Sequence, residues 1–258
     1  MDSRTLLSIV VDRSGSMESM GNEPNKAINA FVKDQQGDNV DISLLRFDHE
    51  CDRFMDMVPS KEFNLKADDI APRGMTALYQ AIGDSIEYTE NIASEYDKII
   101  FMIMTDGEEN SSQGKFKGEN GRRLLKEMIT KNESTKKWTF YFLGANIDSK
   151  FVGDSFGMTP EFCIDFTPDV EGYNSAVRSC SQAVYRSRTG EDGGFNDEER
   201  RESMSLGAPV ATRTRARRFD GQGPPPHMPN LTTLDSPCLD NMTPTRNNGG
   251  KKRRFTSN

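Results

Sequence analysis

The sequence has few cysteines and histidines, and their spacing argues against the metal sites that these residues usually form. None of the four cysteines forms a Cys-x-x-Cys pair, and none lies at a metal-ligand spacing from either of the two histidines. We therefore expect reduced thiols rather than a zinc site, and an intracellular, cytoplasmic location. The four cysteines are Cys51, Cys163, Cys180 and Cys238.

Long apolar segments are also missing. No stretch approaches the ~18 consecutive apolar residues that a membrane-spanning helix needs. Only seven largely apolar residues follow Met1–Arg4 before polar residues begin, so the start of the chain does not have the pattern of a signal peptide. We expect neither a membrane span nor a secretory leader.

The main body of the chain lacks an excess of positive charge. The net charge of −7 divides unevenly, because residues 188–258 carry 12 Lys and Arg against 9 Asp and Glu, whereas residues 1–187 carry 21 against 31. This argues against nucleic-acid binding through a basic face of the body.

Residues 188–258 have no sustained hydrophobic period, and they hold seven of the twelve prolines. Such a segment cannot bury enough apolar surface to offset the entropy lost on ordering. We predict one domain over 1–187 and a disordered, basic, Pro-, Gly- and Arg-rich tail over 188–258. Basic clusters at 213–218 and 251–254 leave open a nuclear address or a nucleic-acid contact for this tail.

Strand-like and helix-like patterns alternate along the body of the chain. Apolar or alternating segments predict strands over 5–11, 40–47, 52–58, 98–105, 138–143 and 161–164. Helical spacing predicts helices over 24–36, from 77, around 124–129, over 148–156 and over 170–184. We expect an α/β fold: a doubly wound, mostly parallel six-stranded sheet with one antiparallel edge strand and helices on both faces.

Oxygen-bearing side chains follow two of the predicted strands and precede one predicted helix. Asp12, Ser14 and Ser16 follow the first strand, Asp106 follows strand 98–105, and Thr76 stands before the helix that starts near residue 77. Ligands of an open parallel sheet lie beyond the carboxyl ends of its strands. Oxygen ligands suit a hard cation such as Mg²⁺. Helix capping would explain any one of these residues, but not their common edge.

The pattern Asp12-x-Ser14-x-Ser16, with Thr76 in Gly-Met-Thr-Ala-Leu and Asp106 in Thr-Asp-Gly, resembles a von Willebrand factor type A (vWA) domain of the intracellular type. The resemblance covers roughly residues 4–187, and all five positions of the family's metal-ion-dependent adhesion site are filled. It implies that the hydroxyls ligate Mg²⁺, with Mn²⁺ or Ca²⁺ as alternatives, and that a partner's Asp or Glu completes the coordination.

The resemblance implies a Mg²⁺-dependent protein-interaction module, monomeric on its own, that acts as an intracellular scaffold or assembly factor. A metal-dependent phosphoester hydrolase is the alternative for the same site. The sequence offers no nucleophile, base or phosphate-binding loop beside these residues, so we expect a protein that is not an enzyme. A factor driven by its basic tail is a further alternative.

Overall fold

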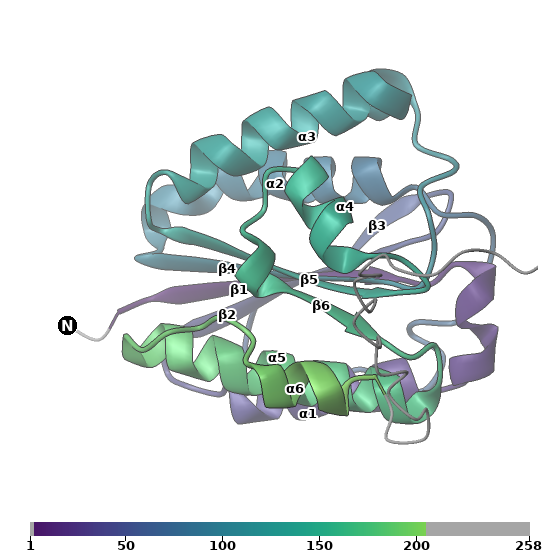
Figure 1. Ribbon diagram of the computed structural model, residues 1–258. Coiled ribbons are helices and arrows are strands. Elements are labelled where there is room, and N and C mark those ends of the chain that lie inside the picture. Colours follow the sequence, from purple (N-terminus) through teal and green to yellow (C-terminus); the bar gives the residue numbers. More distant parts are fainter. Residues whose placement is uncertain (1–2, 205–258) are drawn as a thin grey trace, which may run out of the picture. The chain divides into compact units, whose positions relative to one another are not determined.

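A computed structural model describes residues 3–204, which fold into one six-stranded sheet with helices on both faces (Figure 1). The strand order is β3-β2-β1-β4-β5-β6. The strands are β1 (Thr5–Asp12), β2 (Val40–Phe47), β3 (Cys51–Pro59), β4 (Lys98–Thr105), β5 (Trp138–Ala145) and β6 (Cys163–Phe166). The helices are α1 (Glu23–Asp34), α2 (Leu78–Ile92), α3 (Gly118–Glu133), α4 (Ser149–Ser155), α5 (Val170–Thr189) and α6 (Asp197–Glu202).

The sheet is mixed, as the sequence predicts. Five strands run parallel, and β3 pairs antiparallel with β2 at one edge, after the short turn 48–50. The central strands β1 and β4 are almost entirely buried, because helices cover both of their faces. All five parallel strands therefore end at the same edge of the sheet.

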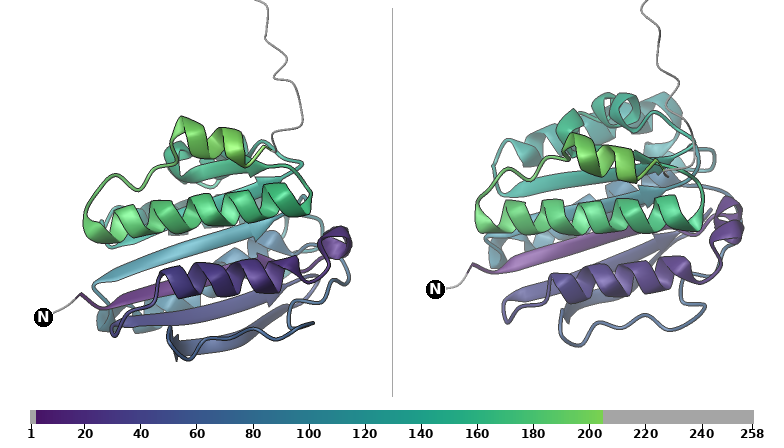
Figure 2. Two further views of the ribbon diagram at one scale, coloured as in Figure 1. Left: turned by 90° about the horizontal axis from the view of Figure 1, so that it is seen from below. Right: turned by 60° about the horizontal axis from the view of Figure 1, so that its bottom comes forward.

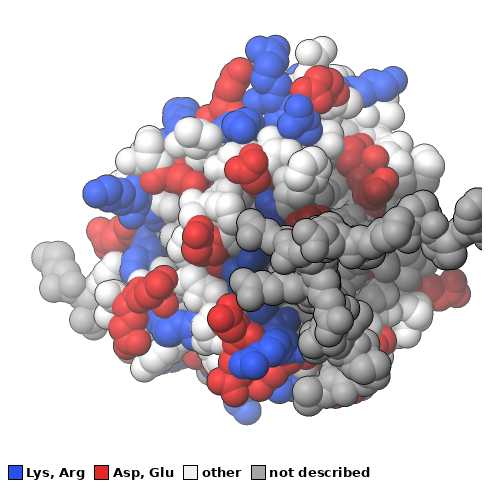
Figure 3. All heavy atoms as spheres, viewed as in Figure 1, with Lys and Arg blue, Asp and Glu red and all other residues white. Residues whose placement is uncertain are grey.

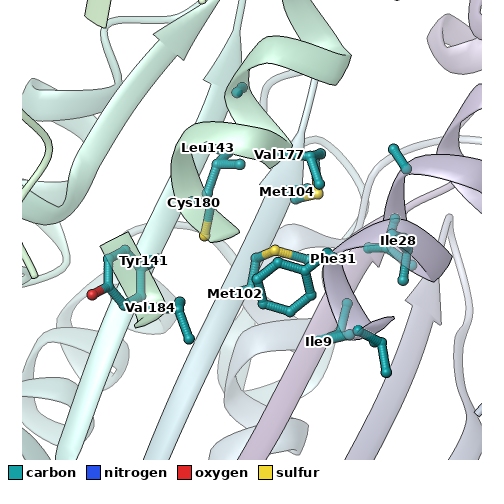
Figure 4. Packing of buried hydrophobic residues seen from close by; sticks show 14 of the residues in the cluster. Ile9, Ile28, Phe31, Met102, Met104, Tyr141, Leu143, Val177, Cys180 and Val184 are labelled. Atoms are coloured by element: carbon teal, nitrogen blue, oxygen red, sulfur yellow. The ribbon is translucent and has the colours of Figure 1, made fainter. Parts of the chain in front are cut away.

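Each face of the sheet has its own hydrophobic core. Helices α2, α3 and α4 cover one face, and α1, α5 and α6 cover the other, where α1 and α5 lie side by side (Figures 1 and 2). On the second face, Phe31 of α1 and Val177 of α5 pack against Met102 and Met104 of β4 (Figure 4). These two methionines fill the core, where a flexible thioether adapts to irregular gaps.

The last strand begins two residues later than predicted. Pro160–Phe162 forms a single 3-10 turn, and β6 follows at Cys163. Proline at the first position of a helical turn is favourable because it has no N–H to donate. The remaining predicted elements are present, although α3 spans Gly118–Glu133 where only 124–129 was predicted, and α5 extends to Thr189.

The folded part continues past the boundary predicted at residue 187. After α5, a loop buries Phe195 and leads into α6, whose first turn has a capping box formed by Asn196 and Glu199. Glu199 also pairs with Arg186 at 2.7 Å. Residues 188–204 therefore belong to the domain, in contrast to the predicted disorder. The rest of the predicted tail, 205–258, lies outside the described residues.

Within residues 3–204, no helix is both long and apolar enough to cross a membrane. On the face drawn in Figure 3, basic and acidic side chains are interspersed, and neither sign forms a continuous area.

Candidate metal site at the carboxyl edge of the sheet

Asp12 ends β1 and is completely buried. Its Oδ1 accepts a 2.6 Å hydrogen bond from the backbone N–H of Ser14, which folds the loop back onto the strand end. Its Oδ2 accepts a 2.6 Å bond from Oγ1 of Thr105, the last residue of β4. Because Val11 pairs with Met104 in the parallel register, the next residues on the two strands meet side by side. The register thus fixes the Asp12 carboxylate.

The two serines and the second aspartate form a chain of close oxygens. Ser14 Oγ lies 3.0 Å from Ser16 Oγ, and the Ser16 hydroxyl donates a 2.6 Å hydrogen bond to Oδ1 of Asp106. Ser14 and Asp106 are buried, whereas Ser16 is exposed. The oxygens of the loops after β1 and β4 therefore meet beneath an opening to solvent.

Thr76 reaches the same point from the loop before α2. Its N–H donates to Oδ1 of Asn110 at 2.9 Å, and its carbonyl accepts from the N–H of Asn110 at 3.0 Å. A Cβ built on Gly107 would lie 3.5 Å from Thr76 Oγ1 and 3.7 Å from Ser16 Oγ. Both hydroxyl oxygens thus lie within 4 Å of one position beside Gly107. The loop that carries Thr76 therefore borders the oxygens of Ser14, Ser16 and Asp106.

Helix capping does not account for these side chains. The N-cap residue of α2 is Ala77, so Thr76 stands outside the cap position. Ser14 is the N-cap of the 3-10 helix Gly15–Met20, but its side chain makes no capping hydrogen bond. Asp148 shows what a cap looks like in this chain, since its carboxylate accepts from the N–H of Phe151 at the start of α4.

Both carboxylates of the site are held away from water. Burial and, to a smaller extent, the charge of Asp106 raise the pKa of Asp12 to about 6, against the hydrogen bonds from Thr105 and Ser14. Burial also raises the pKa of Asp106, and the hydrogen bond from Ser16 opposes that shift. Two desolvated carboxylates at one point favour a bound cation, which would stabilise their charged forms.

The donor set fits a small hard cation. It contains only oxygens, from two carboxylates and three hydroxyls. An octahedral Mg²⁺ with ligands at about 2.1 Å sets neighbouring ligand oxygens about 3.0 Å apart. The separation of Ser14 Oγ and Ser16 Oγ is 3.0 Å. Softer metals prefer imidazole and thiolate ligands, which this point does not offer among the described residues.

Three supporting residues were missed by the sequence reasoning. Thr105 holds Asp12, Asn110 holds the backbone of Thr76, and Nδ2 of Asn146 donates to the carbonyl of Asp106 at 3.3 Å. Asn146 lies directly after β5 in the left-handed conformation, with a positive φ of 58°. Thr105 could have been found from its place at a strand end beside Asp106, but Asn110 carries no local signal.

A second acidic group lies in the turn between β2 and β3. Asp48, His49 and Glu50 bring one ligand atom each within 4.8 Å of one another. However, Arg73 already contacts Oδ2 of Asp48 at 2.6 Å and Oε2 of Glu50 at 2.7 Å. The guanidinium takes the place that a cation would fill, so this group forms an ion-pair network. His49 is a half-exposed residue of this turn.

A recess of about 400 Å³ opens beside the metal site. Gly107 and Glu108 form the rim next to the site, and the walls are mostly apolar. Phe151 stands at the opening with 73% of its surface exposed, and Met75, next to Thr76, is 55% exposed. The apolar walls are formed by Leu78, Tyr79, Ile147, Val152 and Phe156.

Neither a protein-family model nor a curated protein sequence matches the chain. Solved structures do. The vWF domain of the type V pili tip protein Mfa5 from Porphyromonas gingivalis superposes with a TM-score of 0.52, at 11% identity, over 72% of this chain and 97% of that one. The chain has a vWA fold.

Two further structural neighbours are larger than this chain. The pilus adhesin SpaC from Lactobacillus rhamnosus GG gives a TM-score of 0.55 at 11% identity, over 72% of this chain and 30% of SpaC. A variant of the PilB minor pilin from Streptococcus sanguinis gives 0.53 at 12% identity, over 72% and 62%. The chain thus spans less than two thirds of both proteins. At this identity the likeness shows the vWA fold alone.

Proposed function

We propose that this vWA-fold protein is a Mg²⁺-dependent interaction module that binds a carboxylate of a protein partner. The proposal is supported by five oxygen-bearing side chains on three loops that hydrogen bonds join at this edge of the sheet. Among them, Ser16 Oγ lies 3.0 Å from Ser14 Oγ and 2.6 Å from Oδ1 of Asp106, an all-oxygen set that suits Mg²⁺. Mn²⁺ or Ca²⁺ could occupy the same oxygens. The five residues are Asp12, Ser14, Ser16, Thr76 and Asp106.

In this proposal the five residues have two chemical roles. Ser14, Ser16 and Thr76 supply neutral hydroxyl oxygens, whereas Asp12 and Asp106 supply the negative charge. When bound, the cation would offer a free coordination position to an outside anionic oxygen. Because two carboxylates leave the site with no excess negative charge, a third carboxylate from a partner would not be repelled and could bond directly to the cation at that position.

The recess beside the site supports a partner with an apolar residue next to its acidic one. Phe151 exposes a large apolar surface in the recess, and Met75 does so next to Thr76. Exposed apolar side chains around a polar centre are typical of binding surfaces. The pilus adhesin SpaC shares the fold, so an adhesive role is one that this fold serves in another protein.

Binding, rather than catalysis, fits the groups near the site. His49 is the one histidine among the described residues, and its Nδ1 lies 2.9 Å from the carboxylate of Asp48. The pKa of the Cys51 thiol is raised to about 12 by burial, and then by nearby acidic groups, so it is no ready nucleophile. A phosphoester hydrolase would need such a group beside the cation.

We also propose that the protein acts as a monomer in the cytoplasm, as a scaffold or assembly factor. The described cysteines, Cys51, Cys163 and Cys180, are free thiols. That state is the usual one in a reducing compartment.

The test is a titration of the metal-free full chain with Mn²⁺, in which electron paramagnetic resonance measures the concentration of free Mn²⁺. We expect one site in the wild type and none in Asp12→Ala, with both proteins folded by circular dichroism. Capture of an immobilised peptide set with central Asp or Glu should then require Mg²⁺ and disappear in EDTA. Equal Mn²⁺ binding by the wild type and Asp12→Ala would refute the assignment.

A further inference from the structure

Asp48 is a buried carboxylate that touches both loops of the metal site without belonging to it. It follows β2 directly and is 0% exposed. Its Oδ2 lies 2.9 Å from Nε of Arg13, an ion pair without hydrogen-bond alignment, and accepts a 2.6 Å hydrogen bond from Nε of Arg73. One oxygen thus binds an arginine from each loop.

The two arginines stand within the site's own sequence. Arg13 lies between Asp12 and Ser14, and Arg73 lies in the loop that carries Thr76. Any movement of either arginine therefore moves residues that surround the proposed cation.

Backbone hydrogen bonds join the same two loops. The N–H of Arg73 donates to the carbonyl of Arg13 at 2.7 Å, and the N–H of Gly15 donates to the carbonyl of Gly74 at 3.2 Å. The carbonyl of Asp48 accepts from the N–H of Ala77 at 2.7 Å, directly after Thr76. Asp48 thus holds the Thr76 loop from both ends, through Arg73 and Ala77.

The charges of Arg13, Asp48 and Arg73 also affect the binding of a cation nearby. Arg13 is only 6% exposed, and a buried guanidinium needs a partner. Burial alone would raise the pKa of Asp48, but the Glu50 N–H, the Arg73 hydrogen bond and the charge of Arg13 lower it overall. A charged Asp48 compensates positive charge that would otherwise stand beside a divalent ion.

We propose that Asp48 is a positioning residue for the metal site: its carboxylate clamps the Thr76 loop onto the Asp12–Ser16 loop through Arg73 and Arg13, and so sets the cation affinity. The inference rests on the proposed function. Asp48 does not contact the cation itself.

Arg73→Gln separates the clamp from simple electrostatics. Removing a positive charge near a cation site would, by Coulomb's law alone, raise the cation affinity. Losing the clamp lowers it, because Thr76 is no longer held in place. Arg73 is half exposed, so the loss of its ion pair leaves the fold stable. We expect the Mn²⁺ affinity of this variant to fall at least fivefold, with an unchanged melting temperature in EDTA.

Asp48→Asn is the second variant, and we expect a loss of at least tenfold because both arginines lose their counter-charge. The matched controls are Arg122→Gln, which breaks the Arg122–Glu119 pair on α3, and Asp38→Asn, which breaks the exposed Lys61–Asp38 pair at the opposite end of β2. The Mn²⁺ affinity of both controls should stay within twofold of that of the wild type. Full chains are titrated with Mn²⁺ alone.

The outcomes are distinct. No Mn²⁺ binding by the wild type would overturn the proposed function and this inference together. Binding by the wild type, with equal or tighter binding by Arg73→Gln, would overturn the inference and leave the function standing. If Asp48→Asn does not fold, Arg73→Gln decides alone.

Discussion

The hydroxyl of Ser16 donates a 2.6 Å hydrogen bond to Oδ1 of Asp106, ninety positions further along the chain. The contact joins the loop after β1 to the loop after β4, two strands that pair in parallel at the centre of the sheet. The site is therefore a property of the sheet edge rather than of either loop alone. A substitution in one loop should therefore alter the positions of residues in the other.

Ser16→Ala should reduce Mn²⁺ affinity at least tenfold, because it removes one donor oxygen and frees Asp106 from its hydrogen-bond partner. The side chain is exposed, so the free energy of unfolding should change by less than about 1 kcal/mol. Isothermal titration calorimetry measures the affinity. Ser19→Ala, an exposed serine three residues on, is the control and should bind as the wild type does.

Cation binding should weaken below about pH 6, because Asp12 must lose its proton before it can serve the cation. Burial raises the pKa of this carboxyl to about 6. One displaced proton lowers the apparent affinity by up to about tenfold per pH unit below that value. Calorimetry from pH 5 to pH 8 checks this. An affinity independent of pH over that range would contradict a role for Asp12.

In EDTA, the raised pKa of Asp12 should make the stability of the fold depend on pH. The pKa of Asp12 is higher in the folded state, about 6, than its ordinary value of 3.8, so the native state holds the proton more tightly. The free energy of unfolding should therefore fall as pH rises from about 4 to about 6, by at most about 3 kcal/mol. Urea unfolding of Asp12→Asn should lack this contribution.

The position of Asp12 and Asp106 at one edge of the sheet could be predicted, because parallel strands end on the same side and apolar runs mark where they end. The Asp48 network could not. Its ion pairs depend on how the turn between β2 and β3 folds over the Thr76 loop, and neither segment has a periodic pattern. His49 illustrates this, since its ring packs where a Cβ on Gly74 would lie only 2.2 Å from Nδ1.

The end of the domain was misplaced for a different reason. Helix α6 is short and highly charged, so a search for apolar periodicity overlooks it. Its signal was a cap: Asn196 followed three residues later by Glu199, the spacing of a capping box. The single apolar anchor, Phe195, carries too little hydrophobic signal to identify a folded segment among polar neighbours.

Gly107→Ala should weaken cation binding without unfolding the protein. The added methyl group would lie in ordinary van der Waals contact with Oγ1 of Thr76 and Oγ of Ser16, between the two hydroxyls. The control is Gly83→Ala, whose Cβ would lie 2.1 Å from the ring of Phe116. That variant should lose about 1–3 kcal/mol of stability and keep its Mn²⁺ affinity. The reverse result would place the site elsewhere.

Phe151→Ser should weaken partner binding while leaving the metal untouched. Phe151 is 73% exposed at the mouth of the recess, so its loss removes contact surface but no core packing. On arrays of peptides in Mg²⁺, the wild type should prefer Glu flanked by Phe or Leu over Glu flanked by Ser. The variant should lose this preference, whereas Tyr185→Ser, which removes an exposed aromatic of α5, should retain it.

Truncation distinguishes the observed end of the domain from the predicted one. A chain ending at Met204 keeps every described contact, so we expect its melting temperature to match that of the full chain. A chain ending at Ser187 loses Phe195, which packs at 5.7 Å from the ring of Tyr141, and the Arg186–Glu199 pair.

Loss of a buried phenylalanine costs about 3–5 kcal/mol. For a domain of this size, that corresponds to roughly 10 °C in melting temperature. Circular dichroism at 222 nm, recorded in EDTA so that a cation cannot mask the loss, measures both truncated chains. Equal melting temperatures for the two truncated chains would mean that residues 188–204 contribute nothing to the stability of the domain.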